Sequence, residues 1–264
     1  MDLQLKGKTA LVTGSTAGIG FAIASMLVGE GADVVINGRS DRRVKGAVGR
    51  MEKERHGAGV KGIAADLGSR AGFEALVSAI PEIDILVNNL GVYEVKPFAE
   101  ISDDDWMRIF EINVISGVRL CRHYLPRMLT KGWGRIVFIS SESGLQIPVE
   151  MIHYGVTKTA QIALARGLAE AAAGTDVTVN SVLAGPTRSE GVERFLREMA
   201  QSQGTDVEAV EKEFFNTSRP TSLLKRFATP EEVAAMVVYI CSPLASATNG
   251  AAVRVDGGVV RSIG

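Results

Sequence analysis

Thr9-Ala-Leu-Val-Thr-Gly-Ser-Thr-Ala-Gly-Ile-Gly20 starts as a short apolar, β-branched run and ends in a turn that contains three glycines. The run is typical of a buried strand, and the glycines allow a tight turn into a helix that we expect from residue 18 onward. The first turn of such a helix has free N–H groups and a partial positive charge, which favour a pyrophosphate. The spacing is GxxxGxG rather than GxGxxG, so its position after the first strand carries the prediction. We expect the turn to bind a dinucleotide through Gly14, Ser15, Thr16, Gly18, Ile19 and Gly20.

The same alternation of a short apolar run and an amphipathic stretch continues along the chain. It predicts strands over residues 9–13, 32–37, 60–65, 83–88, 135–140, 177–182 and 252–255. It predicts helices over residues 18–30, 40–56, 69–79, 103–130, 153–173 and 229–241. Strands that are apolar on both faces and alternate with helices indicate right-handed crossovers onto a parallel sheet. The predicted fold is therefore α/β, a single Rossmann-type domain over residues 1–264 with a doubly wound sheet of mainly parallel strands flanked by helices.

Residues 186–226 interrupt this alternation between the last two predicted strands. The stretch is largely polar and predicts two helices, over residues 190–203 and 206–216. A connection of this length inside a compact domain is more often functional than a plain linker, and the simpler alternative is a helical insertion without a function. We expect it to be a lid that closes over the substrate.

The composition excludes several classes of protein. With 46% hydrophobic and 22% charged residues the chain is that of a globular protein, and a net charge of −1 argues against nucleic-acid binding. No window has the length of a membrane span, and residues 1–8 lack the apolar run of a signal peptide. The two cysteines make no disulfide framework and no residues have metal-site spacing, so we expect no metal and a cytoplasmic location.

The end of the second predicted strand should select the cofactor. A carboxylate there binds the ribose diol of NAD, whereas a cation pairs with the 2′-phosphate of NADP. The sequence is Ile36-Asn-Gly-Arg-Ser40, without a carboxylate. Because Arg39 offers a planar fork to a phosphate, we predict NADP(H) rather than NAD(H). The ends of the third and fourth strands add further expected cofactor contacts, at Asp66, Leu67, Asn89 and Gly91.

Four polar residues are the candidate catalytic groups. Tyr154 and Lys158 lie four positions apart in a predicted helix and therefore share a face. Ser141 ends the fifth strand, and Asn113 lies within the predicted 103–130 helix. A nearby ammonium group lowers the pKa of a phenol, so Tyr154 can exchange a proton with a substrate oxygen while Ser141 stabilises charge there. His153 adjoins Tyr154 but points about 100° away around the helix, which favours a structural role.

Together these motifs resemble the short-chain dehydrogenase/reductases over nearly the whole chain. The matching residues are Thr13–Gly20, Asp66, Asn88–Gly91, Asn113, Ser141, Tyr154, Lys158 and Val255–Gly258. Leu90 departs from the usual alanine, and Ala184 replaces the proline before Gly185. The resemblance implies hydride transfer between the nicotinamide and a carbonyl or alcohol carbon, with Tyr154 as general acid or base. It also implies that Tyr154 and Lys158 contact the cofactor, Lys158 at the ribose, and that Asn113 anchors a water leading from Lys158 to solvent. It further places Gly185, Thr187 and Ser189 on the cofactor.

The segments around the catalytic candidates predict the class of substrate. We expect a cavity above Ser141 and Tyr154, walled by residues 92–98, 142–153 and 187–216, with these candidates in its lining: Tyr93, Gln146, Ile147, Met151, Phe195, Met199, Phe214 and Phe215. Such a lining suits a mid-sized hydrophobic carbonyl or alcohol. One alternative is a 3-oxoacyl-[acyl-carrier-protein] reductase, with Arg122 and Arg127 as candidate carrier contacts. Another is a non-catalytic NADP-binding redox sensor, against which the four catalytic candidates argue. The resemblance also implies a homotetramer or homodimer.

Overall fold

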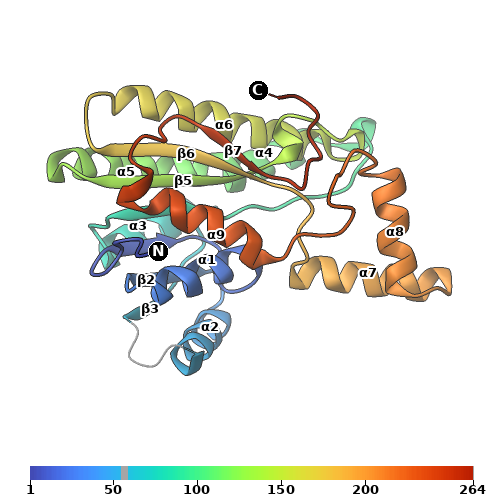
Figure 1. The fold of residues 1–264 in the computed structure, drawn as a ribbon, viewed down its shortest axis with the longest axis horizontal. Helices are drawn as coiled ribbons and strands as arrows, with labels where there is room; N and C mark the ends of the chain where they lie inside the picture. Colours follow the sequence, from blue (N-terminus) through green and yellow to red (C-terminus); the bar gives the residue numbers. More distant parts are fainter. Residues whose placement is uncertain (55–58, 264) are drawn as a thin grey trace.

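A computed structural model describes residues 1–54 and 59–263. Its centre is a seven-stranded sheet of order β3-β2-β1-β4-β5-β6-β7, in which each neighbouring pair of strands is parallel (Figure 1). The strands are β1 (Thr9–Val12), β2 (Asp33–Gly38), β3 (Val60–Ala64), β4 (Ile85–Asn88), β5 (Gly134–Ser141), β6 (Val177–Ala184) and β7 (Ala252–Val255). The predicted doubly wound sheet is confirmed, and every predicted strand is present with its ends within about two residues, the usual uncertainty of such boundaries.

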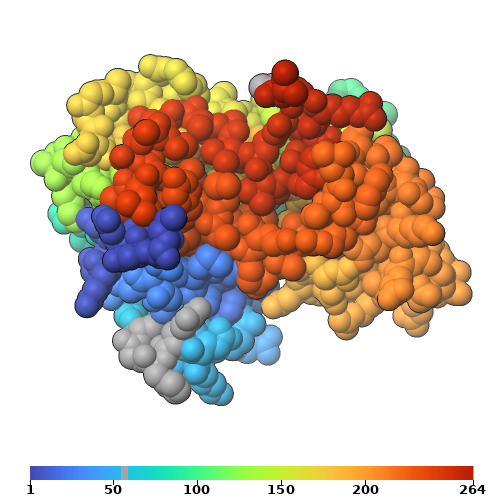
Figure 2. Space-filling model, in the orientation of Figure 1, coloured from blue at the N-terminus to red at the C-terminus, as the bar shows by residue number. Residues whose placement is uncertain are grey.

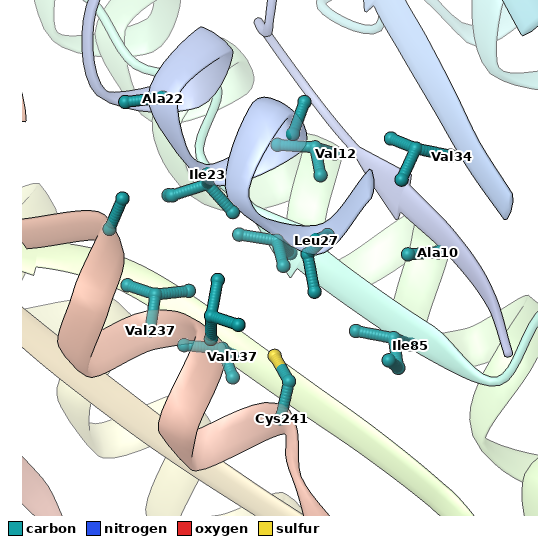
Figure 3. Packing of buried hydrophobic residues seen from close by; sticks show 14 of the residues in the cluster. Ala10, Val12, Ala22, Ile23, Leu27, Val34, Ile85, Val137, Val237 and Cys241 are labelled. Atoms are coloured by element: carbon teal, nitrogen blue, oxygen red, sulfur yellow. The ribbon is translucent and has the colours of Figure 1, made fainter. Parts of the chain in front are cut away.

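Helices cover both faces of the sheet, because its central strands are apolar on both sides. On one face lie α1 (Gly18–Gly29), α2 (Asp41–Glu54) and α9 (Pro230–Cys241). Figure 3 shows Ile23 and Leu27 of α1 with Val237 of α9 against the strand residues Val12 and Val137. On the other face lie α3 (Arg70–Ala79), α5 (Ser116–Lys131) and α6 (Ile152–Ala171). The last two residues of the predicted 40–56 helix lie outside the described residues.

The structure corrects the predicted 103–130 helix. It divides this stretch into α4 (Asp103–Phe110), the π-helical turn η2 (Glu111–Ile115) and α5. The backbone N–H of Ser116 donates to the carbonyl of Glu111, five residues earlier instead of four. An extra residue in a single turn barely changes the apolar periodicity, so the sequence pattern did not reveal it. Such turns are frequent at functional sites, and this one carries Asn113.

The winding of the sheet changes direction between β1 and β4, and ligands of open α/β sheets bind at this point, beyond the carboxyl ends of the strands. β4, β5 and β6 end there at Asn88, Ser141 and Ala184, and β1 leads there into Gly14. Short 3-10 turns continue some of the connections: η1 (Phe98–Glu100), η3 (Glu142–Gly144), η4 (Val149–Met151) and η5 (Pro243–Ala245). The fold therefore gathers the candidate site segments at one end of the sheet.

The predicted helices within residues 186–226 are confirmed as α7 (Glu190–Gln203) and α8 (Val207–Thr217). They pack on each other around a small cluster of their own: Leu196, Ala200, Val210, Phe215 and Phe227. In the space-filling view this orange segment projects from the body, and an indentation separates it from the blue N-terminal part (Figure 2). Across residues 1–54 and 59–263, the helices are all too short or too polar to cross a bilayer.

Candidate active site

The glycine turn after β1 closes onto the end of β4. Gly14 has a φ of +60°, a left-handed conformation that favours glycine. A Cβ on Gly20 would overlap Nδ2 of Asn89 and lie 2.7 Å from the carbonyl oxygen of Gly14. Asn89 holds the turn from the other side, because its Nδ2 donates to the carbonyls of Thr13 (2.9 Å) and Gly14 (3.1 Å). The turn is therefore a fixed backbone cradle, which the close approach of a pyrophosphate requires.

This turn forms one wall of a groove of about 640 Å³. The predicted cofactor residues that line the groove are Gly14, Thr16, Gly18, Ile19, Gly20, Arg39, Asp66, Asn89, Gly91 and Ser189. The side chains of two others point into the protein instead. The hydroxyl of Ser15 donates to the carbonyl of Val12 (2.6 Å), and Leu67 is buried in an apolar cluster. Any contact that Ser15 or Leu67 makes with a ligand in the groove is therefore through the backbone.

The groove is cationic where β2 ends. The amide of Asn37 donates to the carbonyls of Ile63 (3.2 Å) and Ala65 (3.1 Å), so it is held against β3. Arg39 and Arg43 are exposed and line the groove at this point. The structure thus places two of the basic side chains that follow β2 at the groove, and the preference for NADP(H) stays a prediction.

A second cavity, of about 460 Å³, adjoins the groove, since the neighbours Val92 and Tyr93 line one each. Ser141 and Tyr154 lie in its wall together with Gly185 and Thr187. The three predicted wall segments are all present, and the apolar lining consists mainly of Tyr93, Val95, Met151, Val192, Phe195, Leu196, Met199, Val210, Phe214 and Phe227. Three predicted lining residues, Gln146, Ile147 and Phe215, are not in this wall; Phe215 is buried between α7 and α8.

Tyr154 and Lys158 share one face of α6, as their spacing predicts. Nζ of Lys158 lies 5.5 Å from the centre of the Tyr154 ring. The ammonium group is buried and donates to the carbonyl of Ile139 (2.8 Å) and to Oε1 of Gln161 (3.1 Å). The hydroxyl of Ser140 donates to the carbonyl of Lys158 (2.8 Å), so α6 is held against the end of β5. These bonds fix the lysine behind Gly91 of the groove wall; Lys158 itself is in the lining of neither the groove nor the cavity.

Burial controls the protonation of both groups. It raises the pKa of the Tyr154 phenol, and the negative charge of Glu142 acts in the same direction. Burial lowers the pKa of Lys158 to about 8, and the charge of Glu142 opposes this change. We expected the ammonium to lower the pKa of the phenol, and in the protein alone the direction is the opposite, because desolvation outweighs neighbouring positive charge. Tyr154 therefore holds its proton at neutral pH.

Asn113 and Lys158 are linked through Gln161. Nε2 of Gln161 donates to the backbone carbonyl of Asn113 (2.6 Å), while its Oε1 accepts from Lys158. The side chain of Asn113 is occupied elsewhere: it accepts from the N–H of Val92 (2.8 Å) and donates to the hydroxyl of Thr157 (3.0 Å). Gln161 therefore bridges the ammonium group and the backbone at Asn113. The water that the family resemblance places on Asn113, leading from Lys158 to solvent, stays a prediction.

Ser141 is held by a carboxylate. Its hydroxyl donates to Oε2 of Glu142 and accepts from the N–H of Ser143 (3.1 Å). Nε of Arg219 donates to the other oxygen of Glu142 (3.0 Å). Both charged side chains are buried and line the same cavity as Ser141. The site thus contains an ion pair that joins the end of β5 to the segment after α8.

Sequence reasoning missed Glu142, Gln161 and Arg219. A charged residue directly after a buried strand, and a polar residue one turn after Lys158, were signals for the first two. Arg219 lies 77 residues from Glu142 in the chain, and no local sequence pattern indicates that the two side chains pair. His153, by contrast, has the expected structural place, buried with its ring 6.0 Å from that of Trp106. In the described ranges, no three His, Cys, Asp or Glu side chains gather where they could hold a metal ion.

Comparison with known proteins gives one consistent result. The family model described as enoyl-(acyl carrier protein) reductase matches residues 14–260. The chain is 49% identical over 263 residues to the uncharacterized oxidoreductase YvaG of Bacillus subtilis, covering all of both chains. It is 36% identical to the 3-oxoacyl-[acyl-carrier-protein] reductase FabG of Aquifex aeolicus, covering 98% of this chain and all of that one.

Solved structures agree with this result. The structure of L-sorbose reductase from Gluconobacter frateurii, complexed with NADPH and L-sorbose, superposes with a TM-score of 0.93. The two chains are 31% identical, and each is covered completely. The matched family model, the relatives and the arrangement of Ser141, Tyr154 and Lys158 lead to the same conclusion. This chain belongs to the short-chain dehydrogenase/reductases, oxidoreductases that act on carbonyl and alcohol groups with a nicotinamide cofactor.

Proposed function

We propose that this enzyme is an NADP(H)-dependent reductase of mid-sized, largely apolar ketones and aldehydes. The observation that carries the proposal is the pair of adjoining cavities. One is a glycine-walled groove with two arginines and no carboxylate at the end of β2, and the other is an apolar cavity that contains Ser141 and Tyr154. The sorbose reductase structure that resembles this chain contains NADPH, which supports the choice of the phosphorylated cofactor.

The groove fits a dinucleotide, because its wall includes the glycine turn and the start of α1, whose free backbone N–H groups favour a pyrophosphate. In this proposal the turn from Gly14 to Gly20 holds the pyrophosphate, Arg39 pairs with the 2′-phosphate, and Asp66 faces the adenine. Lys158 holds the nicotinamide ribose. Gly185 and Thr187, which line the cavity, and Ser189, which lines the groove, would contact the nicotinamide part of the cofactor. The bound cofactor supplies the hydride.

Residues of the chain then protonate the substrate oxygen and stabilise the charge that develops on it. Tyr154 keeps its proton in the buried site and donates it to the carbonyl oxygen as charge develops there. Ser141 donates a hydrogen bond to the same oxygen and stabilises that charge. Lys158, whose pKa is about 8, is still mainly the ammonium form at neutral pH and places positive charge beside the phenol. Asn113 and Gln161 hold Lys158 in place.

The charges around the second cavity favour a free small molecule over a carrier-bound one. Its wall includes Glu142, Glu150 and Glu213 but, among the described residues, only one basic side chain, Arg219. Acidic carrier proteins bind to basic surfaces, whereas the wall of this cavity is mainly acidic. A purely regulatory dinucleotide sensor is disfavoured because a sensor has no use for the proton donor Tyr154.

Three further parts of the proposal concern the molecule as a whole. We propose that α7 and α8 form a lid over the substrate, because Phe195, Met199 and Phe214 of these helices line the cavity. We also propose a cytoplasmic enzyme that assembles as a homodimer or homotetramer. Light scattering after size-exclusion chromatography measures the number of subunits, and a monomeric mass would contradict the assembly.

A cofactor and substrate screen tests the proposed activity. The purified protein is mixed with NADPH or NADH and a panel of aryl and alkyl ketones and aldehydes, together with an acetoacetyl-carrier thioester, and the loss of reduced-cofactor absorbance is followed. We expect kcat/KM to be higher with NADPH than with NADH, and higher for free ketones than for the thioester. A preference for NADH, or for the thioester alone, would contradict the proposal.

A further inference from the structure

The buried carboxylate beside Ser141 has a consequence for substrate choice. Glu142 is 4% exposed and Arg219 is 8% exposed, so both charges lie out of water. An isolated buried carboxylate is very costly, and the guanidinium of Arg219, with its Nε 3.0 Å from Oε1, offsets this cost. Arg219 also donates through Nη1 to Glu150 (3.3 Å) and to the carbonyl of Ser218 (2.8 Å), which fixes its position. The carboxylate of Glu142 is thus paired with a guanidinium, and its two oxygens accept hydrogen bonds.

Before a substrate binds, the hydroxyl proton of Ser141 is therefore already in a hydrogen bond to Glu142. Its hydroxyl donates to Oε2 of Glu142, and a hydrogen bond to an ionised acceptor is stronger than one to a neutral carbonyl. In the proposed reaction the same hydroxyl must turn to the substrate oxygen. A plain ketone offers only a hydrogen-bond acceptor. When the Ser141 hydroxyl rotates toward it, Oε2 of Glu142 therefore loses its hydrogen-bond donor. A buried acceptor without a partner is unfavourable, and a plain ketone therefore binds against this loss.

A substrate with a hydroxyl on the carbon next to the carbonyl removes this loss. The two oxygens of such a group lie about as far apart as two hydrogen-bonded oxygens, which is also the relation between Oγ of Ser141 and Oε2 of Glu142. The carbonyl oxygen can accept from Ser141 and Tyr154 while the neighbouring hydroxyl donates to Glu142. Each donor then has an acceptor and each acceptor a donor.

Resting on the carbonyl reduction proposed above, we infer that the substrates are α-hydroxy ketones with an apolar tail and that Glu142, held by Arg219, recognises the hydroxyl. The tail lies among the apolar residues of the lid, such as Phe195, Met199 and Phe214. In the reduction one C=O becomes one CH–OH: the carbon gains the hydride of the reduced nicotinamide and the oxygen gains the proton of Tyr154. The hydroxyl bound to Glu142 is unchanged, and the product is a vicinal diol.

Three aryl ketones of matched shape test this inference: α-hydroxyacetophenone, α-methoxyacetophenone and acetophenone. The methoxy compound keeps the electron-withdrawing oxygen but cannot donate a hydrogen bond. We expect wild-type kcat/KM to be about tenfold or more higher for the hydroxy than for the methoxy ketone, because only the former supplies a donor to an ionised acceptor. Equal values for these two ketones would overturn the inference without touching the proposed reductase activity. Absence of NADPH-dependent turnover for all three would overturn the reductase proposal itself.

The variant Glu142→Gln assigns the effect to this side chain. Its amide oxygen can keep the bond from Arg219, so its NH2 group faces Ser141 and presents a donor where the carboxylate presented an acceptor. We expect the hydroxy-to-methoxy ratio to fall to about one while acetophenone is still reduced. Glu208→Gln, a charge removal at an exposed position of α8, should leave the ratio at its wild-type value. A ratio that survives in Glu142→Gln would overturn the role of Glu142.

Discussion

The groove and the cavity beside it are built in different ways. One wall of the groove, the glycine turn, owes its shape to backbone, since Gly14, Gly20 and the start of α1 lie within one short stretch that Asn89 holds closed. The cavity is built from side chains that come from residues as far apart as Tyr93 and Phe227. Backbone groups bind the phosphates that all dinucleotides share, whereas side chains distinguish one substrate from another. Evolution can therefore change the cavity while the groove keeps its cofactor.

Replacing Tyr154 should give the largest difference between the two regions, because it should affect turnover in the cavity much more than cofactor binding in the groove. We expect Tyr154→Phe to lower kcat by about 10²–10⁴-fold, the usual contribution of a positioned proton donor, while NADPH binding is retained. Stopped-flow turnover and fluorescence titration of the cofactor measure the two quantities. Turnover close to that of the wild type would show that the phenol is not the acid.

Lys158 is buried next to the groove wall, and its burial should make stability depend on pH. The folded pKa of about 8 lies below the ordinary value of 10.5, so between these values the unfolded chain binds more protons than the folded one. The free energy of unfolding of the wild type, relative to Lys158→Met, should therefore rise with pH from about 8 to about 10.5, by up to about 3 kcal/mol. Urea denaturation of both proteins at several pH values measures this. A difference that stays flat or falls over that range would contradict the buried ammonium.

Replacing the arginine that lines the groove at the end of β2 should change cofactor binding and leave the substrate cavity unaffected. We expect Arg39→Ala to weaken NADPH binding about tenfold, because an exposed charge-assisted hydrogen bond contributes about 1–2 kcal/mol, and to leave NADH binding unchanged. Arg42→Ala is the matched control, since Arg42 is exposed but does not line the groove. Equal losses for the two cofactors would mean that Arg39 does not contact the 2′-phosphate.

Gln161 should have a smaller effect on turnover than Tyr154. Gln161→Leu removes the connection between Lys158 and the carbonyl of Asn113 but leaves the bond from Lys158 to Ile139. We expect kcat to fall by about tenfold, comparable to the loss of one hydrogen bond to a charged group, and the pH profile of kcat to shift. A reduced kcat with an unchanged pH profile would point to a packing role only.

The smallest expected effect concerns the lid helices α7 and α8, where bound substrate should change only the rate of local opening. In residues 190–217 the buried side chains Leu196, Ala200, Val210 and Phe215 form a small cluster with Phe227, separate from the two clusters of the main core. The segment is also tied to the rest of the chain by the ion pairs Arg188–Glu211 and Arg50–Glu190. Substrate bound among these helices should slow proteolysis of this segment, because cleavage follows local opening. Limited proteolysis with cofactor alone, and with cofactor and a ketone, measures the change. Equal cleavage in both would argue against a lid.

The sequence by itself determined the layers of the fold and the glycine turn of the groove. Short apolar strands alternating with amphipathic helices leave few other ways to bury both faces of a sheet, and the glycines of residues 14–20 and the YxxxK spacing are local patterns. Periodicity could not locate the π turn at Asn113, because one extra residue hardly changes which side chains are apolar. Only the tertiary structure decided that Gln161 joins Lys158 to Asn113, and that Arg219 neutralises Glu142 beside Ser141. Such pairs form between segments far apart in the chain, and their free energy exists only once the chain has brought them together and excluded water.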